Sequence, residues 1–446
     1  MPRLQGRKKV DGLSTSESKE LRGRPNWQPC PFQRRNDGVC LSPQVMGSPA
    51  QDGNRWIPVT TSLVKLVDLP PSKSHLIRWL LLAAQGENSV EIHGVEGAAK
   101  DACAMRDALI QLGVQIEIET DTWTVHGVGA NGFKCPREGL DFQNSGTAFR
   151  LLSIAAMRIG EWITVNGDST LEARIDRDFW ESLEVQVKFD SSGRNLPMQV
   201  KGPIILDSLA LDVSKTSQHL SALALSMPAR NHPLNLNKEG EMVSRRHAEL
   251  TFDLAAECGS SNSVDDSILS PWKCEPPSRL QIPSDASHIV FWKLYEMLHD
   301  TTVEWPDVAA SDSIGAEVLE GLNLYEAQTI NLCDANDLIT PLAAAMAIGG
   351  GGEIVGASHA QFKESNRVTC TVEMLEAFSI EVQSAPDGLR ISGGQNPIAP
   401  NHIVPTFGDH RMQMTAVILA TKVGAEIEGA GLHEVSFPKF LNFIQP

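Results

Sequence analysis

The sequence predicts an α/β protein built from repeated units that gather in two clusters of three. Strand-like and helical stretches alternate along most of the chain. Six helices each follow a short polar stretch, here called a helix mouth. These mouths recur 72 residues apart, at Lys73, Ser145 and Ser217 and again at Asp337 and Asp409. At 446 residues the chain exceeds the usual size of one domain, so two clusters fit better than one core.

Residues 1–55 differ from the rest of the chain and are expected to be a disordered basic extension. They hold ten Lys and Arg against five Asp and Glu and show no apolar periodicity. A targeting segment and an over-long gene start, with Met46 as the later start, are the alternatives.

The first helix mouth follows a strand expected within residues 57–67. A polar Ser-Lys-Ser after two prolines leads into a Leu- and Ala-rich helix from Ser74 that stops at Gly86. This places Ser74 and Arg78 one turn apart with Lys73 at the mouth, where free backbone N–H groups also point. The set predicts a site for phosphate or carboxylate. An ordinary N-capped surface helix would carry the same residues.

The elements that follow show the order strand, helix, strand, helix, strand, strand. We expect a strand at 89–92, an amphipathic helix at 101–112 and two short strands at 114–118 and 122–125. The same pattern returns after the later mouths. The second helices of those units are predicted at 174–183, 244–258, 313–322, 363–378 and 437–443.

Two later motifs combine acids and cations. Lys363 to Arg367 is expected to open a helix, with these two cations one turn apart and Glu364 between them, which suits proton transfer beside an acidic substrate. Gly408-Asp-His-Arg precedes the apolar helix 412–421 and places Arg411 at a helix mouth. For the first motif taken alone, a solvated helix start is the favoured interpretation, and a capping Asp is the alternative for the second.

Two single residues complete the candidates. Asp337 precedes an uncharged helix at 338–348 and is either an N-cap or a general base. Arg174 is a further candidate cation, although Arg177 beside it carries the same signal.

Composition limits the classes of partner. The net charge of −17 argues against nucleic acid, and any anion site must be built locally from a few cations. No uncharged apolar run reaches the roughly 18 residues of a membrane span, so we expect no membrane partner and a cytoplasmic location. The eight cysteines lack the spacing of metal ligands and are read as reduced thiols.

Six motifs then occur in an order that resembles the enolpyruvyl transferases, most closely the branch that acts on shikimate 3-phosphate. They are Pro71-Ser-Lys-Ser with Arg78, Asn144-Ser-Gly-Thr-Ala-Phe-Arg150, Thr216-Ser-Gln218, Lys363-Glu-Ser-Asn-Arg367, Gly408-Asp-His-Arg-Met-Gln-Met414 and Phe437-Pro. The resemblance runs from Trp56 to the C-terminus.

The resemblance implies an inside-out α/β barrel of two similar domains, each of three βαβαββ units. Domain I would comprise residues 56–71 plus 285–446 and domain II residues 72–284, closing over the substrates at a hinge near Pro70 and Pro283. It implies transfer of the carboxyvinyl group of phosphoenolpyruvate to the 5-hydroxyl of shikimate 3-phosphate, with release of phosphate. It further implies a monomer without metal or organic cofactor.

The same resemblance assigns residues to roles. Asp337 would take the proton of the attacking hydroxyl, and Lys73 with Glu364 would handle the proton delivered to the methylene carbon. The shikimate 3-phosphate site would comprise Lys73, Ser74, Arg78, Thr216, Ser217, Gln218, Ser244, Asp337, His359 and Lys363. The phosphoenolpyruvate site would comprise Lys73, Gly146, Arg174, Gln218, Arg367 and Arg411.

The chain departs from the family pattern at several of its positions. Val435 replaces a lysine expected to help bind phosphoenolpyruvate, and Lys439 is the nearest cation that could stand in for it. The other departures are His247 for a tyrosine, His359 for an asparagine, Asn366 for an aspartate and Arg245 for a lysine. They bear on the substrate more than on the fold.

Two other functions are compatible with the resemblance. One is the related transferase that acts on UDP-N-acetylglucosamine, although its Lys-Asn at the first motif and its loop cysteine are not evident here. The other is a catalytically altered or silent homologue that binds an anionic metabolite. Retention of Lys73, Asp337, Glu364, Arg367 and Arg411 argues against that second alternative.

Overall fold

A computed structural model describes residues 53–305 and 314–444. The expected N-terminal extension up to residue 52 lies outside the described residues. Arg55, which was expected to belong to that extension, instead begins strand β1 (Arg55–Ile57).

The buried apolar side chains form two groups. The first core extends from Leu76 to Ile282. The second core combines Ile57 to Leu69 with Ala286 to Ile444.

The elements around the first core alternate between helices and short strands. Its helices are α1 (Lys73–Gln85), α2 (Lys100–Gln111), α3 (Gly146–Ala156), α4 (Ser169–Ala173), α5 (Arg177–Ser182), α6 (Gln218–Ser226) and α7 (Arg245–Glu257). Its strands are β2 (Ser89–His93), β3 (Gln115–Ile118), β4 (Thr122–His126), β5 (Leu140–Asp141), β6 (Ile163–Asn166), β7 (Gln186–Lys188), β8 (Met198–Lys201), β9 (Ser208–Asp212), β10 (Leu234–Glu239), β11 (Ile268–Leu269) and β12 (Arg279–Gln281).

The elements around the second core follow the same alternation. Its helices are α8 (Ile289–His299), α9 (Ala316–Leu319), α10 (Ile339–Ile348), α11 (Arg367–Ala377), α12 (His410–Val423) and α13 (Phe440–Ile444). Its strands, besides β1, are β13 (Gln328–Asn331), β14 (Gly351–Val355), β15 (Val382–Ala385), β16 (Gly388–Ser392) and β17 (Ala425–Ile427).

The sheets repeat one pairing pattern. In each larger sheet a parallel pair is followed by an antiparallel strand, in the orders β12-β2-β4-β3, β5-β6-β8-β7, β11-β10-β9 and β13-β14-β16-β15. Three of the parallel pairs are joined through a helix that opens at a polar mouth, α3, α6 or α10. This recurrence is the structural form of the sequence repeat.

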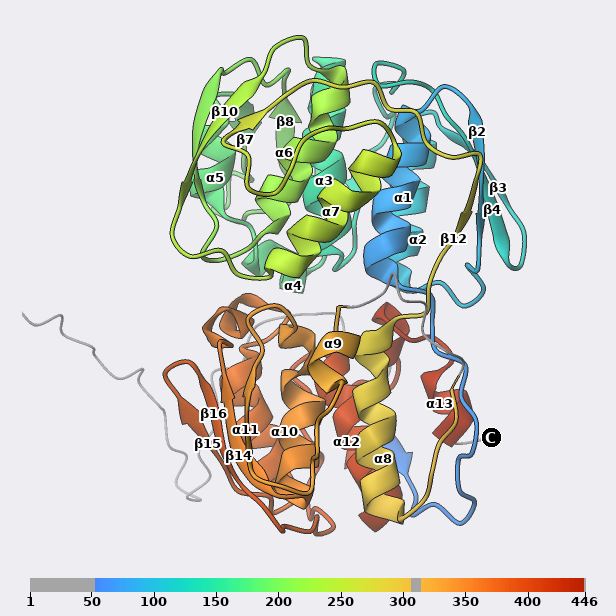
Figure 1. Cartoon of the computed structure of the whole chain (residues 1–446), viewed down its shortest axis with the longest axis vertical. Coiled ribbons are helices and arrows are strands. Elements are labelled where there is room, and N and C mark those ends of the chain that lie inside the picture. Colours follow the sequence, from blue (N-terminus) through green and yellow to red (C-terminus); the bar gives the residue numbers. More distant parts are fainter. Residues whose placement is uncertain (1–52, 306–313, 445–446) are drawn as a thin grey trace, which may run out of the picture. The chain divides into compact units, whose positions relative to one another are not determined.

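The helices lie inside and the sheets outside. Helices α1, α3, α6 and α7 contact one another, with the sheets that contain β2 and β10 at their outer sides (Figure 1). Helix α10 has all but its last residue buried, and α12 is buried from His410 to Thr421. A helix buried on every side needs no polar stripe, which explains why these segments are rich in Ala, Leu and Met.

The prediction of a strand within residues 57–67 is wrong except at Ile57, the last residue of β1. Strand β1 ends at Ile57, because Pro58 removes a backbone donor and a polar Thr-Thr-Ser follows. Its place beside β2 is taken by β12, which arrives some two hundred residues later and runs parallel to β2.

Several helix starts also differ from expectation. Helix α5 begins at Arg177, because the side chain of Asp176 accepts a hydrogen bond from the Phe179 amide. Helix α11 begins at Arg367, because the Asn366 side chain accepts one from the Thr369 amide. Helix α13 begins only at Phe440, and α9 is far shorter than the expected 313–322, whose first residue lies outside the described range.

None of the described helices combines the length and apolarity needed to cross a bilayer.

Candidate functional site

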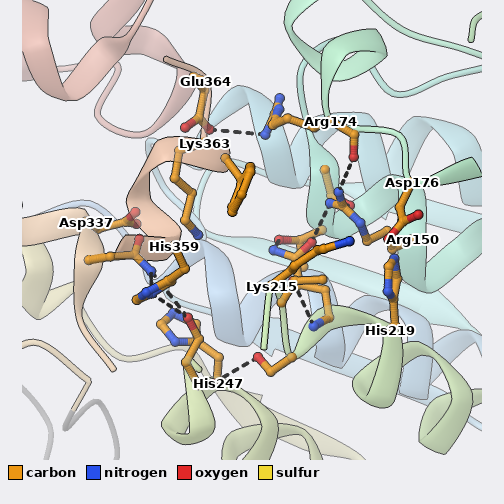
Figure 2. A pocket seen from close by; sticks show the side chains of 18 of the residues that line it. Arg150, Arg174, Asp176, Lys215, His219, His247, Asp337, His359, Lys363 and Glu364 are labelled. Carbon is orange, nitrogen blue, oxygen red and sulfur yellow. Dashed lines mark hydrogen bonds and ion pairs between the residues drawn. The ribbon is translucent and has the colours of Figure 1, made fainter. Parts of the chain in front are cut away.

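A cavity of about 560 Å³ is lined by residues from both cores (Figure 2). It collects thirteen of the fifteen residues that the resemblance assigned to substrate binding or to proton transfer. These are Lys73, Ser74, Arg78, Gly146, Arg174, Thr216, Ser217, Gln218, Ser244, Asp337, His359, Lys363 and Glu364. The two exceptions, Arg367 and Arg411, are buried behind its wall.

Lys73 is the first residue of α1 and lies at the expected helix mouth. Its Nζ is 2.9 Å from Oδ2 of Asp101, which belongs to α2. Burial lowers the pKa of Lys73, but the carboxylates of Asp101, Asp337 and Glu364 outweigh that effect and the pKa is raised. Lys73 is therefore an ammonium at neutral pH.

Arg78 lies one turn after Ser74, as expected, and holds the cavity wall together. Its Nη1 donates to the Ser74 carbonyl at 2.8 Å, its Nη2 to the His247 carbonyl at 2.9 Å and its Nε to Thr251 Oγ1 at 2.7 Å. Burial lowers the pKa of Arg78 to about 10, which leaves it charged at neutral pH. The residue joins α1 to α7 as well as contributing charge.

Two arginines surround the start of α3. Arg150 donates from Nη1 to Gln218 Oε1 at 2.7 Å and from Nη2 to the Arg174 carbonyl at 2.7 Å. Arg174 Nη1 lies 3.4 Å from Glu364 Oε1 and so links the two cores across the cavity. A Cβ on Gly146 would come within 2.7 Å of Arg150 Nη1 and 3.2 Å of Arg174 Nη1. Glycine therefore leaves these guanidiniums in place.

The third helix mouth of the first core meets the second core through Ser244. The Ser217 hydroxyl donates to the Ser244 carbonyl at 2.9 Å, and the Ser244 amide donates to the Cys333 carbonyl at 2.9 Å. Ser244 has φ 51°, a left-handed conformation that is strained for serine. Asn336 Nδ2 donates to its hydroxyl at 3.3 Å. These bonds fix the strained residue at the junction of the two cores.

A cluster of acids and arginines forms the wall contributed by the second core. Arg367 Nη1 lies 2.6 Å from Asp337 Oδ1, its Nη2 lies 2.7 Å from Glu364 Oε2, and its Nε lies 2.8 Å from Asp409 Oδ2. Arg411 Nη2 is 3.2 Å from the other Asp337 oxygen. One guanidinium thus orients three carboxylates, two of which face the cavity.

The charges of this cluster set the ionisation of its acids. Burial opposes ionisation of Asp337, but Arg411 and Arg367 hold its pKa well below the usual range. For Glu364, Arg367 and Arg174 likewise outweigh burial, and its pKa is well below normal. Both are therefore carboxylates at neutral pH.

The expected helical arrangement of Lys363 and Arg367 is wrong. Lys363 has an extended backbone after the short helix η5 (Ser358–Phe362), and helix α11 begins at Arg367. Lys363 nevertheless reaches into the cavity (Figure 2). Burial lowers its pKa.

The two histidines that depart from the family pattern both line the cavity. Burial lowers the pKa of His247 to about 3 and that of His359 to about 4. Both are neutral at physiological pH and offer hydrogen bonds instead of charge.

Val435, which replaces the expected lysine, is buried in the short helix η6 (Leu432–Val435). Lys439 does not line the cavity, and its Nζ pairs with Glu96 Oε1 at 2.6 Å. A second pair, Lys100 with Glu434 at 2.7 Å, flanks Val435 on its other side. The segment where the lysine is missing is therefore attached to the first core by ion pairs.

The sequence reasoning assigned no role in the site to several side chains that line the cavity or contact its wall. They are Asp101, Arg150, Lys215, Asn336 and Asp409. Arg150 ends a motif that was recognised, and Lys215 precedes another, so position in those motifs was an available signal. Asp101 contacts a partner distant in sequence and gave no local signal. Asp409 was expected only as a capping residue, and its side chain does accept a hydrogen bond from the Arg411 amide at the start of α12; its ion pair with Arg367 was not foreseen.

No group of three or more His, Cys, Asp and Glu side chains among the described residues is placed to hold a metal ion.

Comparison with known proteins shows which family this chain matches. The model of the family described as EPSP synthase (3-phosphoshikimate 1-carboxyvinyltransferase) matches residues 58–323 and 292–444. A protein of Methanosphaera stadtmanae named 3-phosphoshikimate 1-carboxyvinyltransferase is 30% identical over 413 residues, covering 84% of this chain and 95% of its own. One of the same name from Lactococcus lactis is 25% identical over 416 residues, covering 84% and 95%.

Solved structures share the fold. An EPSP synthase from Acinetobacter baumannii gives a TM-score of 0.67 at 20% identity and covers 87% of this chain and 96% of its own. The enolpyruvyl transferase NikO from Streptomyces tendae gives 0.67 at 14% identity with the same coverage. The expected inside-out α/β fold of two similar domains is confirmed, with open sheets in place of a closed barrel.

Proposed function

Because the chain belongs to the EPSP synthase family, we propose that it is a 3-phosphoshikimate 1-carboxyvinyltransferase of the shikimate pathway. It transfers the carboxyvinyl group of phosphoenolpyruvate to the 5-hydroxyl of shikimate 3-phosphate and releases phosphate. One observation carries the proposal: a single cavity holds cations and helix mouths from both cores opposite two ionised carboxylates, Asp337 and Glu364. The substrates together bear two phosphates and two carboxylates, which need such surroundings.

Asp337 is the proposed base for the 5-hydroxyl. Its ion pairs with Arg367 and Arg411 lower its pKa and make it a weak base. These arginines are also assigned to phosphoenolpyruvate, whose negative charge offsets theirs when it binds. Asp337 thereby becomes a stronger base once that substrate is present, which couples proton removal to occupancy of the site.

Glu364 and Lys73 are proposed to manage the proton at the methylene carbon. Protonation of that carbon makes its neighbour electrophilic, and the deprotonated 5-oxygen forms a C–O bond there. Loss of the proton from the same carbon then accompanies cleavage of the C–O bond to phosphate. Glu364 touches both Arg174 and Arg367, so its carboxylate is positioned between cations throughout.

We further propose that residues 72–284 and 56–71 plus 285–446 act as domains that close on the substrates, hinged near Pro70 and Pro283. The two separate buried cores support this. The protein is proposed to act as a cytoplasmic monomer, which light scattering with and without substrates tests.

The test is phosphate release with phosphoenolpyruvate plus shikimate 3-phosphate, beside phosphoenolpyruvate plus UDP-N-acetylglucosamine. Release only with shikimate 3-phosphate is expected. Lys73→Ala should abolish it while the exposed Lys134→Ala leaves it unchanged. Release only with the sugar nucleotide would overturn the proposal, and normal turnover by Lys73→Ala would overturn the site.

Val435 favours a second candidate, a homologue that binds shikimate 3-phosphate without turnover, because an apolar side chain stands where a cation is expected. Calorimetric binding of shikimate 3-phosphate with no phosphate release would establish that candidate instead.

A further inference from the structure

Lys215 is a cavity cation that none of the assigned roles uses. It lines the cavity directly before Thr216, Ser217 and Gln218, and its side chain lies in the middle of the cavity in Figure 2. Burial lowers the pKa of His219 on the same wall, the Arg150 charge adds to that effect, and the charge of the half-exposed Lys215 contributes least. The charge of the Lys215 ammonium therefore acts on a side chain of the cavity wall.

Most other cations of the cavity are committed to protein partners. Lys73 is paired with Asp101, all three nitrogens of the Arg78 side chain donate to protein oxygens, and Arg174 is paired with Glu364. Within the described part of the chain, Lys363 has no hydrogen bond or ion pair, and Lys215 Nζ is 3.9 Å from Asp212 Oδ2. These two ammonium groups are the ones available to a ligand.

The surroundings of Lys215 suit a phosphate. Helix α6 begins beside it, and Ser217 gives that helix no side-chain cap because its hydroxyl donates to Ser244 instead. In the preceding turn, Asp212 Oδ1 accepts hydrogen bonds from the Ser214 hydroxyl at 2.6 Å and from the Ser214 amide at 2.8 Å, which fixes both side chains. The Gln218 amide donates to Thr216 Oγ1 at 3.2 Å, and the Lys215 ammonium with the next amides of the first turn of α6 offers donors to several oxygens of a tetrahedral anion.

We propose that Lys215 binds the 3-phosphate group of shikimate 3-phosphate at the start of α6 and so distinguishes the phosphorylated substrate from shikimate. The inference rests on the proposed function.

The test compares two ligands that differ only in the phosphate. Calorimetry on the full chain measures binding of shikimate 3-phosphate and of shikimate to the wild type, Lys215→Met, Lys215→Arg and the control Lys134→Met. Lys215→Met should weaken shikimate 3-phosphate about 10-fold, the size of a charge-assisted hydrogen bond, and leave shikimate within twofold. Lys215→Arg should recover most of the affinity.

The outcomes separate the inference from the proposed function. Equal loss for both ligands, or no loss for either, would overturn the role of Lys215 while phosphate release by the wild type still supported the reaction. A selective loss in Lys215→Met with no phosphate release by the wild type would uphold Lys215 and overturn the reaction. A wild type that binds neither ligand would overturn both.

Discussion

Replacing Arg367 with glutamine tests the acid–arginine cluster most directly. The guanidinium is 1% exposed and contacts Asp337, Glu364 and Asp409 at 2.6, 2.7 and 2.8 Å. Asp337 and Glu364 line the cavity and can take up water when the arginine is lost. Asp409 is fully buried and would keep only the Ser365 hydroxyl and the Arg411 amide.

The expected cost is that of one uncompensated buried charge, about 3–5 kcal/mol of unfolding free energy at pH 7. This is a large part of the 5–15 kcal/mol typical of folded proteins. Lowering the pH should narrow the gap to the wild type, because loss of Arg367 raises the pKa values of Asp337 and Glu364, which that guanidinium helps to hold well below their usual range. Arg367→Lys keeps the charge but cannot contact all three acids, so it should fall in between.

Urea denaturation followed by tryptophan fluorescence at pH 7 and pH 5 measures the effect. The matched control is Arg390→Gln in strand β16, which lies around the same core. This substitution removes an exposed ion pair with Glu353 and should lower the unfolding free energy by at most about 1 kcal/mol. Equal losses for Arg367→Gln and Arg390→Gln would refute the reasoning.

Three further predictions concern charge and space. The lowered pKa values of Asp337 and Glu364 stabilise the folded state, fully at pH values above the unfolded pKa values of about 4 and progressively less as the pH falls below about 4. Calorimetric melting from pH 7 to pH 3 should therefore show a falling Tm, and a Tm that does not change with pH would contradict this. Lys439→Glu breaks the ion pair with Glu96 and should raise KM for shikimate 3-phosphate about two- to fivefold. Adding Glu96→Lys restores a pair of opposite charges and should recover the KM. If the effects of the two substitutions are purely additive, the two side chains are not coupled. Gly146→Ala should fold normally but weaken phosphoenolpyruvate binding several-fold in calorimetry, since its Cβ displaces two guanidiniums; unchanged affinity would rule out that crowding.

The helix mouths were the predictable part of the site. A polar stretch before an apolar helix is a local signal, and Lys73, Gly146 and Gln218 are the first residues of α1, α3 and α6. Cavity residues therefore came from short-range patterns combined with the resemblance. Arg367 and Arg411 show the limit, because sequence does not tell whether a cation faces a cavity or lies behind its wall.

The errors arose where distant segments determine the outcome. The apolar residues at 57–67 looked like the first strand of a repeat, yet β12 occupies that place beside β2. Pairing between strands two hundred residues apart leaves no mark in local periodicity. Asp101 was missed for the same reason, since its importance lies in the ammonium of Lys73, 28 positions earlier.

Val435 stands where the family pattern has a lysine, and ion pairs on either side of it hold its segment in place. Glu434 and Lys439, on either side of Val435, pair with Lys100 and Glu96 of the first core. These ion pairs attach the C-terminal segment to the part of the chain around the first core. Each such exposed pair contributes at most about 1 kcal/mol, so the charge of the bound anions must still be met inside the cavity. Lys215 and Lys363 can offset that charge. They line the cavity from opposite sides of the chain's two cores, and neither ammonium has a close partner among the described residues.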